Sequence, residues 1–529
     1  MDADYVIVGA GSAGCVVAAR LSEKGARVLL IEAGPRDHHP YIHIPAGTLK
    51  LIHHPRLNWN FSAEPGPGTA GRPIRWPRGK VLGGSSSING MLYVRGNPLD
   101  YDGWAQMGCR GWSFADVLPF FMKSEDYAQG DPAMRGRGGP LRVEDYRTIL
   151  PLTHHFVAAA KAAGYPFSSD LNGRTQDGVG YSQMTRRGRF RQSTARSFLA
   201  PARNRANLRV ETDAFATRLL FKGARCTGVA FRRGGEDHQA LAARSVIVSG
   251  GTVNSPQLLQ ISGIGPPAHL AAIGVPVLSA LAGVGSNLTD HYVARIAHRV
   301  KGTLSVNQMA HGLRLACEAL RFVVTGRGAL TFGITTAQVF CRSREGLASP
   351  DLQLSFTPAS HDPERFGALE REPGLSVAVC PVRPESRGSI MAASADPFAA
   401  PVITPNYLTA PNDLRALLAG LRFTRRILDQ PSIVRYSAGE TEPGPEATSD
   451  TELARYACAF GTTLYHPVGT CRMGEDAMAV VDSRLRVHGI AGLRVIDASI
   501  MPAITTGNTN APTIMIAEKG AAMILEDDR

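Results

Sequence analysis

The sequence has no long apolar run. Apolar stretches of roughly 18 residues or more, which mark a helix that crosses a bilayer, do not occur among its 529 residues. No membrane-spanning helix is therefore predicted. The first predicted strand begins almost at Met1, which leaves no room for the charged and apolar regions of a secretory signal peptide. A cytoplasmic location is expected, and peripheral attachment to the inner face of the cell membrane stays open.

Cysteine is scarce and irregularly placed. The eight cysteines form no C-x-x-C pair and follow no regular spacing. Zinc sites and disulfide frameworks both depend on such spacing, so no metal site is expected and a reducing compartment is. Internal repeats and low-complexity tracts are also missing from the sequence.

Acidic residues are outnumbered by basic ones. The formal net charge of +12 and the pI near 9.5 would suit a nucleic-acid or anionic-membrane partner. The arginines are scattered, however, and the densest cluster, residues 186–191, is short. We expect a solvated basic surface and no nucleic-acid partner, with attraction to anionic lipid headgroups as the less favoured alternative.

The chain is too long for one ordinary core, so two domains or one elaborated domain are expected.

Residues 5–32 carry a dinucleotide-binding pattern. A β-branched run leads into Gly9-Ala10-Gly11-Ser12-Ala13-Gly14, which is the G-x-G-x-x-G pattern that follows a strand. A helix and a second strand, residues 27–31, then end at Glu32. In such units the glycines let the backbone approach a pyrophosphate at the helix N-terminus, and the acid accepts the ribose hydroxyls. A bound dinucleotide is predicted, although this pattern alone does not separate NAD from FAD.

A second glycine turn lies at Gly83-Gly84, directly before three serines. Its backbone N–H groups predict another cradle for a phosphate or a ring edge. One cradle fits many ligands, whereas two suit an extended one such as FAD. Trp59 is a candidate for stacking on a ring system.

The middle of the chain changes character after the dinucleotide pattern. Residues 218–221 and 228–231 predict an antiparallel pair, residues 244–251 predict a buried strand, and Ser255 is a predicted helix N-cap. Residues 300–460 mix helical and β-like stretches without a second glycine fingerprint. We interpret this region as a substrate-facing part built on a sheet.

The last seventy residues hold the candidate chemistry. His466 precedes Pro467, which biases it away from helical backbone angles. A strand over residues 493–496 ends at Asp497, and residues 506–513 lead into a predicted helix over residues 514–525. The N-terminus of that helix would stabilise negative charge.

Four stretches together resemble the glucose-methanol-choline (GMC) family of FAD oxidoreductases, and the resemblance covers essentially the whole chain. The stretches are residues 9–14, 79–89 and 251–265, and the pairing of Tyr465-His466-Pro467 with Gly507-Asn508-Thr509-Asn510. Within the family the motif sequences are most similar to those of bacterial alkanol-type alcohol dehydrogenases and choline dehydrogenases.

The resemblance implies an α/β fold of two domains. The first is a Rossmann-like FAD-binding domain with a parallel sheet, and the second is an α+β substrate-binding domain with an antiparallel sheet. The implied boundaries are 1–150, 195–300 and 460–529 for the FAD-binding domain, and 151–194 and 301–459 for the substrate-binding domain.

The resemblance also implies the site. His466 and Asn510 would be the catalytic pair, with the alcohol hydroxyl between them, its proton passing to His466 and a hydride leaving its carbon for flavin N5. Histidine has the pKa that suits a base near neutral pH, and an asparagine hydrogen-bonds a developing alkoxide without titrating. The residues expected to bind FAD are Gly9, Gly11, Ser12, Ala13, Gly14, Glu32, Ala33, Trp59, Arg78, Val81, Gly83, Gly84, Ser85, Asn89, Gly90, Ala216, Gly250, Asp497, Ala498, Asn508 and Asn510.

One position departs from part of the family. Some members carry a histidine that links covalently to the flavin, and the matching position here is Ile88. FAD is therefore expected to bind without a covalent bond.

The leading hypothesis is oxidation of a primary alcohol to its aldehyde, with electrons passing to a quinone or another acceptor. An oxidase that reduces O2 to hydrogen peroxide is the closest alternative, and a hydroxynitrile lyase-like flavoprotein is the alternative from another class. All four tryptophans lie in the first quarter of the chain, which disfavours an aromatic cage for choline. A neutral or apolar alcohol, aliphatic, benzylic or furanic, is expected instead. The oligomeric state is left open.

Overall fold

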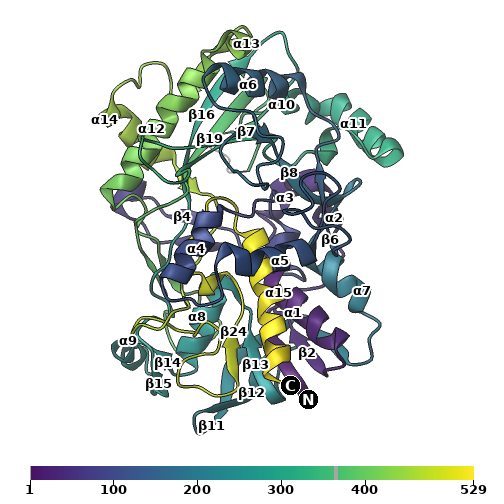
Figure 1. Cartoon of the computed structure of the whole chain (residues 1–529), viewed down its shortest axis with the longest axis vertical. Helices are drawn as coiled ribbons and strands as arrows, with labels where there is room; N and C mark the ends of the chain where they lie inside the picture. The colour runs from purple at the N-terminus through teal and green to yellow at the C-terminus, as the bar shows by residue number, and fades with distance from the viewer. Residues whose placement is uncertain (1, 363–366, 529) are drawn as a thin grey trace.

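Two seven-stranded sheets organise the chain in the computed structural model, which describes residues 2–362 and 367–528 (Figure 1). The first sheet lies in the half of the molecule that holds both termini, and the second lies in the opposite half. The mixed α/β class, with one largely parallel and one antiparallel sheet, confirms the predicted fold class. The residue numbers at which the two predicted domains divide stay a prediction.

The first sheet has a parallel centre. Its strand order is β10-β2-β1-β13-β12-β11, and β24 pairs with the second half of β13. The strands β10, β2, β1, β13 and β24 are parallel, whereas β11 and β12 are antiparallel additions. Their bounds are β1 Asp2–Val8, β2 Val28–Ile31, β10 Leu208–Glu211, β11 Ala214–Lys222, β12 Arg225–Arg233, β13 Glu236–Val248 and β24 Leu493–Val495.

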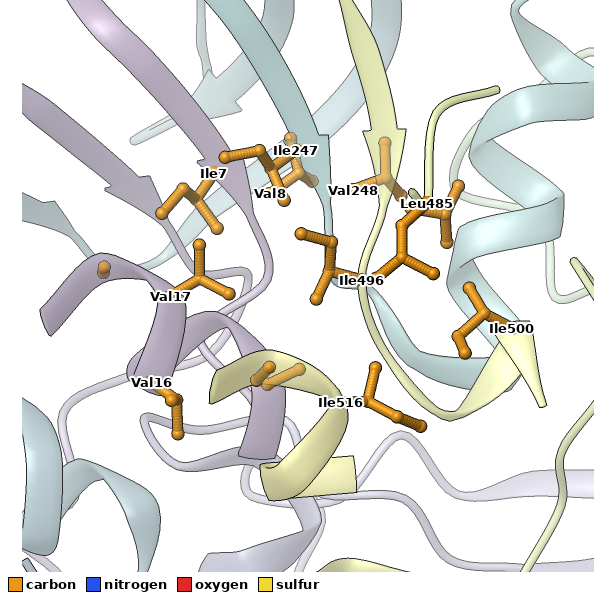
Figure 2. Packing of buried hydrophobic residues seen from close by; sticks show 14 of the residues in the cluster. Ile7, Val8, Val16, Val17, Ile247, Val248, Leu485, Ile496, Ile500 and Ile516 are labelled. Atoms are coloured by element: carbon orange, nitrogen blue, oxygen red, sulfur yellow. The ribbon is translucent and has the colours of Figure 1, made fainter. Parts of the chain in front are cut away.

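Helices cover this sheet, which explains its unbroken apolar strands. All four residues of β2 are buried, as expected for a parallel strand with both faces covered. Figure 2 shows Ile7 and Val8 of β1 beside Val16 and Val17 of α1, with Ile516 of α15 completing the layer. The covering helices are α1 Ser12–Glu23, α5 Phe114–Ser124, α8 Gly251–Ile261 and α15 Asn510–Asp527.

The second sheet is antiparallel throughout. Its order is β22-β16-β19-β18-β17-β7, with β23 paired to β16. The strands are β7 Gly178–Tyr181, β16 Tyr292–Val300, β17 Ala337–Cys341, β18 Leu352–Thr357, β19 Gly374–Pro381, β22 Ser437–Glu442 and β23 Thr462–Thr463. Helices α6 Pro151–Ala162, α12 Pro411–Leu428, α13 Pro431–Val434 and α14 Asp450–Phe460 complete this half.

Residues on the strands of the second sheet alternate between its two faces. Leu352, Leu354 and Phe356 of β18 pack in the core that includes α6 and α12. Ser355 and Thr357, which alternate with these residues, lie on the other face, because successive side chains of a strand point to opposite sides. One face is thus apolar and the other carries small polar groups.

Smaller elements connect the halves. The sheet β5-β6-β8-β9 and the hairpin β3-β4 lie on the connecting segments. Helices α10 and α11 belong to the half that holds the second sheet. Their bounds are β3 Phe61–Ala63, β4 Ile74–Trp76, α4 Pro98–Gln106, β5 Glu125–Asp126, β6 Leu141–Asp145, β8 Gln183–Arg187, β9 Phe190–Arg191, α10 Val306–Met309 and α11 Gly312–Thr325. Within the described residues, none of the helices is both long and apolar enough to cross a bilayer.

Local predictions agree with these bounds with two differences. The antiparallel pair at residues 218–221 and 228–231 is confirmed, with Leu219 opposite Val229. The prediction that Ser255 caps a helix is wrong, because α8 already begins at Gly251 and Ser255 Oγ donates to Asp497 at 2.6 Å. The last helix begins at Asn510 rather than near residue 514, since Pro512 in a first turn gives up no intrahelical hydrogen bond.

Candidate active site

One cavity of about 670 Å³ lies where the carboxyl ends of the parallel strands face the second sheet. Open α/β sheets bind their ligands at this edge. Most of the residues predicted to bind the cofactor line the cavity together with His466: Gly9, Gly11, Ser12, Ala13, Glu32, Ala33, Trp59, Arg78, Gly84, Ser85, Asn89, Gly90, Ala216, Gly250, Asp497, Ala498, Asn508 and Asn510.

Three predicted residues lie behind the cavity wall. Gly14 packs beneath the first glycine turn, and a Cβ there would lie 1.9 Å from the carbonyl oxygen of Gly9. Gly83 donates its backbone N–H to Ala10 at 2.7 Å, and Val81 is buried in a small cluster with Ile88. These residues shape the wall and do not face the cavity.

The two glycine turns are in direct contact. Gly84 has a left-handed φ of 52°, and a Cβ there would lie 2.6 Å from the Cα of Gly11. Only a residue without a side chain allows both backbones to approach this closely. The two predicted cradles therefore form one continuous backbone surface.

Glu32 closes the other end of this surface. It ends β2 and accepts hydrogen bonds from the backbone N–H groups of Ala10 (2.8 Å) and Gly34 (2.9 Å). Burial raises the pKa of its carboxyl to about 7, although these two hydrogen bonds favour the charged form. A carboxylate at this place is suited to accept ribose hydroxyls.

The cavity fits a flavin dinucleotide. The first turn of α1, with Ser12 and Ala13 on the wall, supplies unpaired backbone N–H groups for a pyrophosphate. The glycine surface allows close approach, and the acid lies at its far end. Ile88 lines the cavity at the position of the covalent histidine and carries no nucleophile.

A constrained turn presents His466 to the cavity. The residue before it, Tyr465, has a left-handed φ of 67°, which a non-glycine residue adopts only when its surroundings enforce it. Arg78 donates to the carbonyl of Tyr465 at 2.7 Å, and the backbone N–H of His466 donates to Asp290 at 2.8 Å. The buried Asp290 carboxylate also accepts from Thr463 at 2.6 Å.

A second histidine fixes the tautomer of His466. His291 Nε2 lies 3.2 Å from the carbonyl oxygen of Val382, and a carbonyl only accepts, so this nitrogen carries the proton. The Nδ1 atom of neutral His291 is then an acceptor, 2.9 Å from Nδ1 of His466. His466 therefore donates through Nδ1, and its Nε2 lone pair faces the cavity side.

Burial keeps both imidazoles neutral. It lowers the pKa of His291 to about 4. For His466, burial is again the main cause, and the neighbouring His291 and Arg78 lower its pKa further, to well below the usual range. A neutral imidazole whose Nε2 carries a lone pair is the form that can accept a proton.

The nearest amide to this lone pair belongs to Asn508. Its Nδ2 lies 3.0 Å from His466 Nε2, and its Oδ1 accepts from Gln353 at 3.3 Å. Asn510, the expected partner of His466, also lines the cavity, but its Oδ1 accepts from Ser12 Oγ at 2.8 Å. Asn510 thereby ties the start of α15 to the start of α1.

Sequence reasoning missed several groups that shape this site. His291 and Asp290 precede β16, more than 170 positions from His466, and no local pattern marked them. Arg295 of β16 and Ser355 of β18 line the cavity as well. The alternation of β16 and β18 was the one signal that could have identified the last two.

Comparisons with known proteins agree with this arrangement. The chain matches the family models of the GMC oxidoreductases over residues 3–293 and 384–517. It is 42% identical to the mitochondrial choline dehydrogenase of Homo sapiens, over 98% of this chain and 89% of that protein. It is 40% identical to "Alcohol dehydrogenase [acceptor]" of Pseudomonas putida, over 99% of this chain and 95% of that protein.

The fold matches solved flavoenzymes. The crystal structure of pyridoxine 4-oxidase from Mesorbium loti superposes with a TM-score of 0.91 at 31% identity, covering 99% of both chains. FAD is thus the cofactor of this enzyme, and alcohols are the donors on which this class of enzyme acts. The chain belongs to the GMC oxidoreductase family and is an FAD-dependent oxidoreductase of CH–OH donors.

Proposed function

We propose that this enzyme oxidises a primary alcohol to its aldehyde, with His466 as the base, and passes the electrons to a quinone or another acceptor other than O2. The observation that carries the proposal is the Nε2 lone pair of a neutral, buried His466 on the wall of the cofactor cavity. An alcohol is too weak an acid to ionise near neutral pH without such a base.

His466, Asn508 and Asn510 have different roles in this reaction. The Nε2 atom of His466 takes the hydroxyl proton, and the carbon-bound hydrogen leaves as hydride, so that RCH2OH becomes RCHO. FAD, when bound, supplies the acceptor for that hydride. Asn508 Nδ2, which donates to His466 Nε2, is placed to donate to the developing alkoxide. Asn510, at the positive end of α15, is a second candidate for this role.

The second sheet supports an uncharged alcohol as the substrate. Ser355, Thr357 and Ser376 line the cavity from β18 and β19, on the face opposite the apolar core. Arg295 and Glu442 add one charge of each sign to the lining. This wall offers small polar groups and no net charge, whereas a quaternary ammonium is best held by aromatic faces.

A panel of alcohols tests the reaction. We expect primary alcohols to bleach the flavin without oxygen and to reduce an artificial acceptor, with little peroxide formed in air. Fast peroxide formation would make the enzyme an oxidase, the class to which pyridoxine 4-oxidase belongs. A flavin that no alcohol bleaches would contradict oxidation altogether and favour a lyase.

Choline and 3,3-dimethylbutan-1-ol form a matched pair of substrates, because they share a shape and differ in charge. We expect kcat/KM for the neutral alcohol to exceed that for choline on the order of tenfold, since the described cavity residues on β16, β18 and β19 offer no aromatic face to the cation. A preference for choline would contradict the proposed substrate class and leave the proposed hydride transfer intact.

A further inference from the structure

Helix α11 points its apolar side chains at solvent. Leu313 is 86% exposed, Leu320 65%, Val323 65% and Val324 70%. At about 100° per residue, these four side chains fall within an arc of roughly 100° on one side of the helix. Phe322, the buried residue of α11, lies on roughly the opposite side. A surface helix of a globular protein normally turns its apolar stripe toward the core, and α11 does the reverse.

Arginines border this stripe. Arg314 and Arg321 are exposed and lie two helical turns apart on the same flank of α11. Arg327 follows the end of the helix. Glu318 is the acid of α11. It lies 3.6 Å from Arg321 and accepts from the backbone N–H of Ala329 at 2.6 Å, so its charge is turned toward the segment beneath the helix.

The position of α11 leaves this stripe uncovered. Among the described residues the helix packs mainly on α10 and on the short turn at Ala329–Thr331. In Figure 1 it lies at the outer edge of the half that holds the second sheet. Other exposed apolar side chains of the molecule are spread over its surface, whereas five of them gather on α11. Such a gathered patch marks an interaction site.

The area of the stripe argues against a second copy of the chain. A helix of 14 residues is about 21 Å long and about 10 Å wide, so its footprint is on the order of 200 Å². A stable protein–protein interface needs about 800 Å² from each partner. A bilayer surface has no such requirement, because a single amphipathic helix can insert its apolar face among the lipids.

We propose that α11 docks this enzyme on an anionic phospholipid bilayer. Leu313, Leu320 and Val324 enter the boundary between headgroups and acyl chains, and Arg314 and Arg321 contact lipid phosphates at the same depth. The excess of positive charge on the chain adds to this attraction. The inference does not depend on the proposed alcohol oxidation, since it concerns a surface away from the cavity.

Flotation of the holoenzyme with vesicles tests the proposal. We expect wild-type enzyme to float with phosphatidylcholine vesicles that contain phosphatidylglycerol. Leu313→Ser/Leu320→Ser/Val324→Ser should reduce the bound fraction about tenfold or more. A matched control, Leu241→Ser/Val277→Ser/Val402→Ser, removes three exposed apolar side chains elsewhere and should float like wild type.

The arginines give a second, independent readout. Arg314→Gln/Arg321→Gln should weaken binding to the anionic vesicles and leave the weak binding to pure phosphatidylcholine unchanged. Turnover with a soluble acceptor should be the same in all variants, which separates docking from catalysis. Absence of flotation, or equal flotation of the α11 variant and its control, would overturn the proposal. A wild-type dimer that the α11 variant abolishes would also overturn it, in favour of a second copy.

Discussion

The two sheets of this protein place their functional groups by different means. At the edge of the parallel sheet, backbone geometry makes the site: the turns at Gly11 and Gly84 touch, and a Cβ on the second would clash with the first. On the antiparallel sheet, side chains make the site. Ser355 of β18 and Arg295 of β16 reach the cavity because they lie on one face, each opposite Ala378 of the intervening β19. From this difference we expect cofactor retention and turnover to be separable properties.

Removal of the imidazole of His466 should produce the largest effect. His466→Ala is expected to lower kcat about 10²- to 10⁴-fold, because general-base catalysis is lost. FAD content should stay near that of wild type, since the glycine surface and Glu32 are untouched. Rapid-reaction measurements of flavin reduction together with the flavin-to-protein ratio check this. Near-normal turnover would show that another group is the base.

Gly14→Ala should break the other side of the comparison. Its Cβ would lie 1.9 Å from the carbonyl oxygen of Gly9, so the first turn and α1 must separate. We expect most of the flavin to be lost on gel filtration. Gly103→Ala is the control, because it lies within α4 with nothing near its Cβ. Equal flavin retention by both variants would rule out the role given to the close packing.

His291 sharpens the comparison, because it acts on the base without facing the alcohol. His291→Leu removes the acceptor of the His466 Nδ1–H bond and should lower kcat roughly 10- to 100-fold. His291→Asn places an amide oxygen near the former Nδ1 and should recover part of the loss. The pH profile of kcat/KM separates this from a packing defect, since only loss of the acceptor should shift it. Equal losses in both variants would refute the tautomer assignment.

We expect the smallest effects in the pH dependence of kcat/KM and of folding stability. Burial lowers the pKa of His466 in the folded protein, so its base form persists below pH 6.5, and the acid limb of kcat/KM should lie below that value. The unfolded chain binds protons on His291 and His466 below about pH 6.5, whereas the folded protein binds them only at lower pH. Stability is therefore present above pH 6.5 and is lost as pH falls toward the lowered pKa values.

An unfolding series from pH 7.5 to about pH 4.5 checks the sign of this effect. His466→Gln cannot titrate and should show a shallower loss of stability with acid than wild type. A steeper loss in that variant would contradict a neutral, buried His466.

The sequence predicted the parallel half well because its signals are local. Gly9 to Gly14 and Glu32 fall within one strand–turn–helix–strand unit, so spacing alone predicted that they would lie along one edge of the sheet. The start of α15 and the neighbours of His466 were harder to predict. Asn508 and Asn510 are two positions apart where an irregular segment enters α15, and the backbone path decides which amide lies near the imidazole. The contact between His291 and His466 joins residues that flank β16 and β23, two paired strands far apart in the sequence, and left no trace in local spacing.

The pairing of α1 with α15 has a consequence for how the enzyme matures. Ser12 and Asn510, and Arg20 and Glu518, join the earliest and latest helices of the chain. During synthesis the glycine turn emerges first but lacks its lid of C-terminal residues for almost the whole of translation. We therefore expect flavin loading to be a late event, and a chain that stops shortly before residue 510 to carry the nucleotide fingerprint but to lose flavin readily.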